Sequence, residues 1–482
     1  MRRRDFVTSG AALLAAAPAS QAPAARHPMP DMGAGVGEVP PGPPADHTLR
    51  IAPIALEIAP SHFISTIGYN GTSPGPLLRL KEGRAVTVDV INDSDAAEVV
   101  HWHGMFLPPE VDGAEEEGTA LIPPGARRRY RFTPRPAGTR WYHSHAMAMG
   151  DLHRGTYTGQ YGFAMVEGHD PGRYDQEVFL ALRDWEPFYT DQFVDMDEQQ
   201  QPGPQPERPA KLNTRHPGLE AVSQVYTIND RMLNAGDPIR VRPGTRVLMH
   251  LLNASAIEIR SVALPAHEFH VLALDGNPVP HPAAVKVLTL GPGERIDAYV
   301  EMRQPGVWIL GELDDATRNA GLGVVIQYQG QHRPPQWLPP PPRTFWDYSL
   351  FGTQGAHAAP DRTLEMIFER LPGGSGQFDT WSVNGKPYPH QHEFVLERGK
   401  RHRLVFRNRS DDSHPLHLHR HLFELVDVNG RLTKGVLKDT VIVPMYGRVS
   451  VDLTADQPGL SLFHCHIQQH MDFGFKALFR YA

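Results

Sequence analysis

A short pattern that occurs three times along the chain constrains its fold most. Each copy has an Asn-Gly or Asn-Asp turn, then a glycine turn, and then an alternating strand that ends in Asn. The copies span residues 70–92, 229–253 and 384–408, and they begin about 155 residues apart, a typical domain size. Turns of this kind beside alternating strands predict β-structure. Three β domains are therefore expected.

The composition and periodicity favour an all-β protein. The chain has 46 Pro and 44 Gly among 482 residues, and little of it shows the 3.6-residue period of a helix. This pattern is typical of Greek-key β-sandwiches. The expected domains are residues 46–170, 175–330 and 361–482, with a proline-rich, extended linker at residues 331–360.

The only cysteine of the chain lies in the stretch His464-Cys465-His466, with His470 close behind. On a strand, successive side chains point to opposite faces. The two flanking histidines would then share one face, and Cys465 would point to the other. His470 is near enough to return to the cysteine side. One Cys and two His form the ligand set of a blue-copper electron-transfer site, so two metal sites joined by peptide bonds are predicted here.

Histidines upstream extend both faces by the same alternation. Between residues 414 and 419, His417 and His419 share a face, whereas His414 has the opposite parity. His414 is therefore predicted to join the cysteine side, and the other two to join the histidine side.

More His-x-His pairs occur than chance supplies. With 26 His, about one or two such pairs are expected, whereas six occur, including those at residues 101–103 and 143–145. Two of the six are expected to bind no metal. The pair at residues 390–392 is interpreted as solvated surface, and His421 as a residue beside the site or at the surface.

The motifs HWHG, YHSH, HPLHLH and HCHIQQH resemble, in order, the four copper-binding motifs of the multicopper oxidases. The chain is similar to three-domain, laccase-like members, with features of bacterial copper-efflux and copper-resistance oxidases. This resemblance implies four copper ions: type 1, type 2 and a binuclear type 3 pair. The implied ligands are His414, Cys465 and His470 for type 1, His101 and His417 for type 2, and His103, His143, His145, His419, His464 and His466 for type 3.

The resemblance also implies a fold and an activity. Each domain would be cupredoxin-like, the second would be a spacer without copper, and the three-copper cluster would lie between the first and third. Electrons from phenols or aromatic amines would enter at the type 1 copper, pass from Cys465 to His464 and His466, and reduce O2 to water. Oxidation of Cu(I) for copper tolerance is the alternative function.

Two further residues are assigned by the family pattern. Asp112, just after HWHG, matches an acidic residue near the cluster and is expected to deliver protons. The other interpretation is a turn aspartate before Gly113. Phe475 stands where many bacterial members place a weak axial methionine. Because Phe cannot ligate, a high type 1 reduction potential is expected.

Three aspartates are predicted on the substrate side: Asp411, Asp412 and Asp472. The first two lie beside His414 and would orient a phenol or a cation, or else form a solvated acidic loop. Asp472 follows Met471, which stands where bacterial members often have an acid, and it is a candidate replacement proton carrier.

Copper proteins of other classes fit the ligand count less well. A copper nitrite reductase needs fewer ligands, and a storage protein or chaperone needs no His-Cys-His bridge. The sequence has no methionine-rich insertion of the kind that copper-efflux oxidases often carry, and Met147 and Met149 are expected to be packed. Phenols and aromatic amines are therefore favoured over Cu(I) as substrates.

The N-terminus predicts export. Residues 3–6, Arg-Arg-Asp-Phe, resemble a twin-arginine signal, and the apolar run at residues 11–17 is too short to span a membrane. Residues 1–45 are expected to be this signal and a mobile leader, and the protein a periplasmic or otherwise exported monomer without a membrane span. Its net charge of −7 argues against nucleic-acid binding, and a single Cys excludes an intramolecular disulfide.

Overall fold

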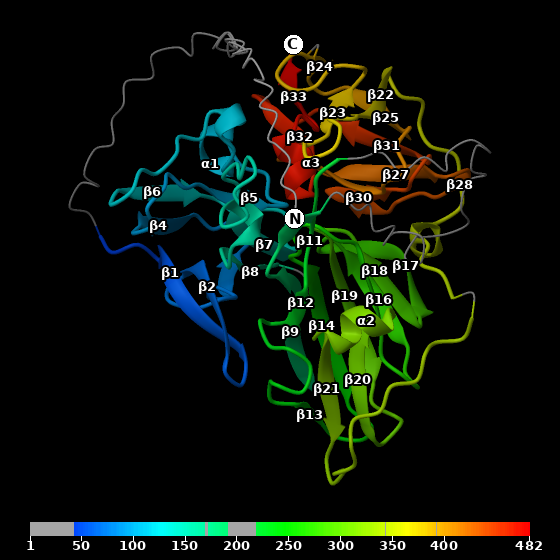
Figure 1. Ribbon diagram of the computed structural model, residues 1–482. Helices are drawn as coiled ribbons and strands as arrows, with labels where there is room; N and C mark the ends of the chain where they lie inside the picture. The colour runs from blue at the N-terminus through cyan, green and yellow to red at the C-terminus, as the bar shows by residue number, and fades with distance from the viewer. Residues whose placement is uncertain (1–42, 169–171, 191–217, 343, 392) are drawn as a thin grey trace, which may run out of the picture. The chain divides into compact units, whose positions relative to one another are not determined.

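Nearly all of the regular secondary structure in the described residues is β-strand, as the sequence predicts (Figure 1). The computed structural model describes residues 43–168, 172–190, 218–342, 344–391 and 393–482. Residues 1–42 of the predicted export signal and leader lie outside these residues, and so does His392. Among the residues described, no helix has the length and apolar character needed to cross a bilayer.

Two sheets, drawn from blue to cyan in Figure 1, share one core and are called the first sandwich. Their strand orders are β2-β1-β4-β6 and β3-β8-β7-β5. Buried side chains from both sheets, among them Val88, Trp102 and Tyr142, pack into a single cluster. The strands are β1 (His47–Ala59), β2 (His62–Tyr69), β3 (Leu78–Lys81), β4 (Val86–Asn92), β5 (Val100–His103), β6 (Arg127–Phe132), β7 (Gly138–Ser144) and β8 (Tyr161–Glu167).

The next two sheets form the second sandwich. Their strand orders are β12-β9-β14-β19-β16-β17 and β13-β21-β20-β15-β18. The strands are β9 (Gln176–Trp185), β12 (Val225–Ile228), β13 (Ile239–Val241), β14 (Arg246–Asn253), β15 (Arg260–Ala263), β16 (Phe269–Leu274), β17 (Asn277–Val285), β18 (Val287–Leu290), β19 (Arg295–Glu301), β20 (Val307–Glu312) and β21 (Gly323–Tyr328). A separate two-stranded sheet pairs β10 (Phe188–Thr190) with β11 (Glu220–Val222).

The last two sheets form the third sandwich. Their strand orders are β23-β22-β25-β31-β27-β28, with β29 also paired to β27, and β24-β33-β32-β26-β30. The strands are β22 (Arg362–Leu371), β23 (Thr380–Val383), β24 (Phe394–Leu396), β25 (Arg401–Asn408), β26 (His414–Leu418), β27 (Phe423–Val428), β28 (Arg431–Leu432), β29 (Leu437–Lys438), β30 (Thr440–Val443), β31 (Arg448–Thr454), β32 (Ser461–Cys465) and β33 (Lys476–Tyr481).

Helices are few and short. The described residues between β21 and β22 hold one 3-10 turn and no other named helix or strand. The helices are α1 (Pro109–Asp112), α2 (Asp315–Asn319) and α3 (Gln468–Asp472), and the 3-10 turns are η1 (Glu115–Glu117), η2 (Gly155–Tyr157) and η4 (Tyr348–Phe351).

The repeated sequence pattern has the same structural role in each sandwich. The asparagine that begins each copy, at residues 70, 229 and 384, has a φ between 51° and 53°, the left-handed conformation that tight hairpin turns require. The asparagine that ends each copy is Asn92, Asn253 or Asn408. Its side-chain amide donates to two backbone carbonyl groups at 2.6–3.0 Å. Each copy thus satisfies one backbone carbonyl group 4 or 5 residues later and another 30 to 37 residues later.

Strand register identifies equivalent positions in the three sandwiches. Cys465 on β32 pairs with the third residue of β26. At the matching places, Ser144 pairs with the first residue of β5 and Glu312 with the third residue of β15. The interior position that carries a thiol in the third sandwich therefore carries a hydroxyl in the first and a carboxyl in the second.

Candidate metal centre

One thiol and two imidazoles converge inside the third sandwich. Cys465 ends β32, His414 begins β26, and His470 lies in α3, whose short turn returns it to the cysteine. The Cys465 Sγ atom is 3.7 Å from His414 Nδ1 and 3.6 Å from His470 Nδ1. All three side chains are buried. The structure thus brings together the three residues predicted as type 1 ligands.

Burial sets the protonation of these three groups. It raises the pKa of the Cys465 thiol and lowers those of His414 and His470, the last to about 3. The neutral imidazoles have lone pairs to offer, and a thiolate at this depth requires a metal ion in place of its proton. Two nitrogens and one sulfur fit a single copper ion.

Two aromatic rings and a serine surround the two histidines. The fully buried Trp381 ring lies 4.7 Å from the His414 ring and 4.2 Å from the His470 ring, between centroids. Phe475, at the predicted axial position, lies 4.8 Å from the His414 ring and offers no donor atom. The Ser410 hydroxyl is 2.8 Å from His414 Nε2, which leaves Nδ1 facing the thiol. Sequence reasoning missed Trp381 and Ser410, since neither belongs to a ligand motif.

Eight buried imidazoles from the first and third sandwiches gather in a second group. Each lies on, or directly after, one of the strands β5, β7, β26 and β32. They are His101 and His103, His143 and His145, His417 and His419, and His464 and His466. These are the residues predicted as type 2 and type 3 ligands. The alternation of side chains along a strand places them together, as expected.

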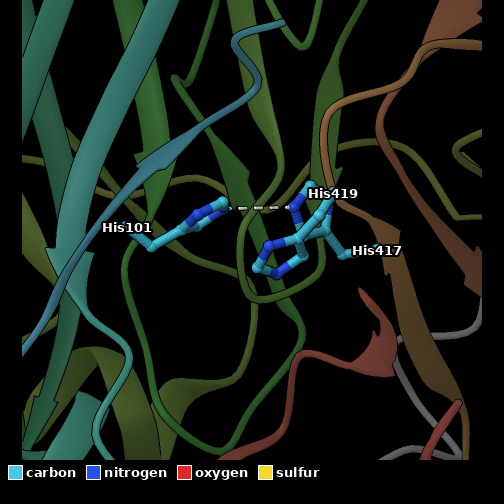
Figure 2. Close-up of side chains that lie close together, drawn as sticks. All are labelled: His101, His417 and His419. Carbon is cyan, nitrogen blue, oxygen red and sulfur yellow. Dashed lines mark hydrogen bonds between the residues drawn. The ribbon is translucent and has the colours of Figure 1, made fainter. Parts of the chain in front are cut away.

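Several imidazole nitrogens face one another at short distances. His419 Nε2 lies 3.0 Å from His464 Nε2, and His145 Nε2 lies 3.4 Å from the same atom. Figure 2 shows His101 facing His417 and His419, and the contact between His101 Nε2 and His417 Nε2 measures 3.4 Å. Such pairs need either a proton or a metal ion between them.

The hydrogen bonds of these rings indicate a metal ion, rather than a shared proton, between the nitrogens. His419 donates its Nδ1 proton to Asp112 at 2.8 Å, and His464 donates its Nδ1 proton to the Cys465 carbonyl oxygen at 2.8 Å. Burial lowers the pKa of both rings, that of His464 to about 3, so each is neutral and carries a lone pair at Nε2. Two lone pairs 3.0 Å apart repel unless a cation lies between them.

Further ring nitrogens lack partners. Among the described residues, His103 Nδ1, His143 Nε2 and both nitrogens of His466 are buried without a hydrogen bond. Buried polar atoms in proteins are rarely left unsatisfied. A group of nitrogen donors with lone pairs and no hydrogen-bond partners fits a cluster of copper ions.

The two metal-binding groups share a stretch of backbone. Cys465 belongs to one group, and its sequence neighbours His464 and His466 belong to the other. The His464 Nδ1 hydrogen bond to the Cys465 carbonyl oxygen provides a second connection between them. The arrangement gives a short path of covalent bonds and one hydrogen bond from the thiol to the imidazole cluster.

Asp112 lies against this cluster, as predicted. Its Oδ2 atom accepts from His419 Nδ1 and is 3.2 Å from His101 Nδ1, while Oδ1 has no hydrogen-bond partner among the described residues. Glu117 lies beside it, with Oε1 3.5 Å from His419 Nδ1. Burial, with Asp112 nearby, raises the pKa of Glu117 well above its usual range. Sequence reasoning missed Glu117, because it lies in a run of three glutamates that belongs to no ligand motif.

A second buried carboxylate, Asp439, holds the opposite side of the cluster. Its Oδ1 atom accepts from His103 Nε2 at 3.0 Å, and its backbone oxygen accepts from His417 Nδ1 at 2.8 Å. Neighbouring positive charge, chiefly that of Arg295, outweighs burial and holds the pKa of Asp439 well below its usual range. Asp439 is 0% exposed and was not predicted from the sequence.

Carboxylates gather beside the type 1 group. The predicted Asp411 and Asp412 are partly buried and pair with Arg370 at 2.5 and 3.3 Å. Two acids that the sequence did not single out complete the group: Glu220 at 3.7 Å and Asp379 at 3.6 Å from the same guanidinium. Glu220 Oε2 is also 4.0 Å from His470 Nε2, and burial raises the pKa of Glu220 to about 7.

Asp472 is buried rather than placed at a substrate-accessible surface. Its Oδ2 atom accepts the backbone N–H groups of Ala148 and Met149, and its Oδ1 atom accepts from Gln468. Burial raises the pKa of Asp472 to about 6. The expectation that Met147 and Met149 are packed is wrong, because their exposed fractions are 38% and 57%.

The two pairs that were expected to bind no metal lie differently. His390 is exposed, and its partner His392 lies outside the described residues. His421 is buried beside the cluster, where Nδ1 bonds the His419 carbonyl oxygen and Nε2 bonds the Tyr481 hydroxyl. Of its two interpretations, the structure selects a residue beside the site.

Comparisons with known proteins agree with this geometry. Profiles of the family described as multicopper oxidase match residues 55–171, 178–330 and 365–482. Multicopper oxidase MmcO of Mycobacterium tuberculosis is 31% identical over 444 residues, which cover 88% of this chain and 84% of that protein. Copper resistance protein A of Pseudomonas syringae pv. tomato is 24% identical over 550 residues, with coverage of 85% and 88%.

Solved structures show the same fold. A multi-copper oxidase from Pseudomonas thermotolerans aligns with a TM-score of 0.67 and 28% identity, over 91% of this chain and 100% of that one. Fet3p, a multicopper oxidase that functions in iron import, aligns with a TM-score of 0.73 and 19% identity, over 90% of each chain. The predicted all-β, cupredoxin-like fold is confirmed.

Proposed function

Because the chain belongs to the multicopper oxidase family, whose members are oxidoreductases that use copper and O2, we propose that it oxidises phenols and aromatic amines in the manner of a laccase. One-electron oxidation of these donors is coupled to the four-electron reduction of O2 to two waters. Bound copper supplies the electron transfer and the O2 chemistry. The observation that carries the proposal is the placement of Cys465 in one metal-binding group and its two sequence neighbours in the other.

Four copper ions are proposed. His414, Cys465 and His470 would hold the type 1 copper, and the 3.4 Å approach of His101 Nε2 to His417 Nε2 supports these two as type 2 ligands. The remaining six imidazoles would hold the type 3 pair. The short path from the thiol to His464 gives the donor electrons their route between the sites.

Asp112 is proposed to hold and pass the protons that water formation requires. Its Oδ2 atom orients His419, so the imidazole keeps its lone pair directed at the cluster. The Oδ1 atom, which has no hydrogen-bond partner in the described part of the chain, remains to take up a proton beside the cluster.

The choice of phenols rests on Phe475. A phenyl ring packed 4.8 Å from the His414 ring supplies no donor to copper, and a missing thioether favours Cu(I) over Cu(II). A type 1 copper of raised potential accepts electrons from phenols more readily. The sequence also lacks a methionine-rich insertion.

A second candidate, oxidation of Cu(I) for copper tolerance, is favoured by the carboxylates around Arg370. Four acids surround one guanidinium there, and Glu220 lies 4.0 Å from His470 Nε2. An excess of negative charge beside the electron entrance attracts a cationic donor.

Oxygen uptake by the copper-loaded protein separates the two candidates when a simple phenol and Cu(I) are compared under identical conditions. A laccase-like enzyme consumes O2 rapidly with the phenol, and Glu220→Gln leaves that rate largely unchanged. A cuprous oxidase prefers Cu(I) and loses part of that rate in the same variant. No uptake with either donor, despite four bound coppers, contradicts both candidates.

The protein is also proposed to act outside the cytoplasm as a monomer. The twin-arginine-like residues 3–6 support this location, and export of an already folded chain suits an enzyme whose cluster joins the first and third sandwiches. Sequencing the N-terminus of protein recovered from the periplasmic fraction tests it, since an uncleaved N-terminus in the cytoplasmic fraction alone contradicts export. Sedimentation of that protein reports its oligomeric state.

A further inference from the structure

The second sandwich contributes none of the eight imidazoles, yet it reaches them through the turn between β18 and β19. Gly293 in this turn has a φ of +87°, and a β-carbon there would lie 2.7 Å from the His466 ring. A larger residue would therefore push against a proposed type 3 ligand. The close approach shows that this turn forms part of the wall of the cluster.

Arg295, the first residue of β19 after this turn, reaches the carboxylate of Asp439. Its Nη1 and Nη2 atoms donate to Oδ1 and Oδ2 at 2.8 and 2.6 Å, and both side chains are 0% exposed. The guanidinium also donates to the backbone oxygens of Gly293 and Asp275 at 2.9 and 3.1 Å. A planar guanidinium held at both ends fixes the orientation of a carboxylate as well as its position.

Asp439 transfers this constraint to two proposed ligands from different sandwiches. Its carboxylate Oδ1 atom accepts from His103 Nε2, and its backbone oxygen accepts from His417 Nδ1. The opposite nitrogens, His103 Nδ1 and His417 Nε2, are therefore the ones that face the cluster. Hydrogen bonds to the far nitrogen of a ligating histidine commonly set its tautomer and ring orientation.

The glycine of the HWHG motif lies against the ion pair between Arg295 and Asp439. Gly104 has a φ of +82°, and a β-carbon there would lie 2.6 Å from Arg295 Nη2 and 2.7 Å from Asp439 Oδ2. The backbone beside His103 thus passes directly over the ion pair. This close approach excludes a side chain at the position.

We propose that Arg295 is a positioning residue for the imidazole cluster. It clamps the Asp439 carboxylate against His103, a proposed type 3 ligand, and fixes the residue whose backbone oxygen orients His417, a proposed type 2 ligand. The second sandwich thereby takes part in the metal site although it supplies no ligand. The inference rests on the proposed function, because it requires copper at the imidazole cluster. It adds a specific residue from outside the ligand motifs.

Replacement of Arg295 by lysine tests the proposal with the charge retained. Lysine keeps the positive charge that Asp439 needs but has no planar fork, so the carboxylate is held at one point instead of two. Groups that orient metal ligands typically contribute 10–100-fold to metal affinity. We expect Arg295→Lys to bind the copper of the imidazole cluster about 10–100-fold more weakly, with a shifted type 2 electron paramagnetic resonance spectrum and a lower copper content per chain, while the blue type 1 band stays intact.

Arg260→Lys is the matched control. Arg260 also lies in the second sandwich, is 1% exposed at its side chain and pairs with Glu258 at 2.5 Å. Its guanidinium lies over the Tyr226 ring. This variant introduces the same change at an equally buried site and should keep the wild-type affinity for the copper of the imidazole cluster.

Affinity is measured by titrating the copper-loaded proteins with a chelator while recording the type 2 resonance, the blue band and the copper content per chain. Asp439→Asn serves as a second variant in case Arg295→Lys fails to fold, and it should show the same selective loss. An unchanged type 2 resonance and affinity in Arg295→Lys overturns the inference, as does an equal loss in Arg260→Lys. A wild-type protein without type 2 copper overturns the proposed function instead, and the inference with it.

Discussion

Replacing Phe475 with methionine should lower the reduction potential of the type 1 copper. The backbone fixes this side chain beside the metal-binding group, because the Cys465 N–H donates to the Phe475 carbonyl oxygen at 3.1 Å and the Phe475 N–H donates to the His470 carbonyl oxygen at 2.9 Å. A methionine at this position therefore starts from the same Cα, and its flexible chain can direct the sulfur to copper.

The size of the effect follows from the strength of the new bond. If a thioether favours Cu(II) by as much as a hydrogen bond to a charged group, the gain is about 1.5–3 kcal/mol. A one-electron potential changes by about 59 mV for each tenfold change in the equilibrium. The expected fall is therefore about 60–130 mV.

The packing cost must be separated from the ligand effect. Phe475 contacts the rings of Phe368 and Trp381 at 5.0 and 5.7 Å, and each aromatic pair contributes about 0.5–1.5 kcal/mol. Phe475→Leu loses the same ring contacts but brings no sulfur, which makes it the control. Anaerobic redox titrations of both variants, followed at the blue band, give the comparison. Equal potentials for the methionine and leucine variants would refute the reasoning.

Two further predictions concern protons. Asp112→Asn should slow reoxidation of the reduced copper sites by O2 about 10²–10⁴-fold, because protons reach the cluster more slowly. Stopped-flow measurements should show that anaerobic reduction of the type 1 copper is unchanged. Unchanged turnover with O2 contradicts the proton role of Asp112. His250 should make stability depend on pH: burial lowers its pKa, but Asp297 at 2.8 Å and Glu177 at 3.1 Å outweigh burial and raise it to about 9. Because the folded pKa is the higher one, this stabilisation is complete below pH 6.5 and is lost as the pH rises through about 9. It amounts to at most about 3 kcal/mol, since Glu177 is partly exposed. The unfolding temperature of the wild-type protein should fall across this pH range, and that of His250→Gln should not show this fall. Parallel plots of unfolding temperature against pH for the two proteins contradict the prediction.

The local part of the site was predictable because strand alternation is a short-range property. His464 and His466 share a face for the same reason that His417 and His419 do, and one lone Cys465 between two histidines marks the second face. The repeated asparagines likewise predict three similar sandwiches. The information on the histidine faces lies within single short strands, and the information on the sandwiches lies within each copy of the repeated pattern.

Residues that act across the fold carried no such signal. Arg295 and Asp439 are 144 positions apart, and nothing in either neighbourhood indicates that they meet. Trp381 is one of seven tryptophans, and only its place between His414 and His470 gives it meaning. Two exposed methionines were expected to be packed, because burial of a single side chain depends on tertiary neighbours that periodicity does not describe.

The contact between His101 and His417 has a consequence for when copper can bind during synthesis of the chain. The two residues are 316 positions apart, yet their Nε2 atoms lie 3.4 Å from each other. While a ribosome makes the chain, its first four cluster histidines exist long before their partners emerge. Copper bound at that stage would have only the four histidines of the first sandwich as ligands. A fully occupied cluster therefore requires that synthesis has passed His466 and that the first and third sandwiches have packed together.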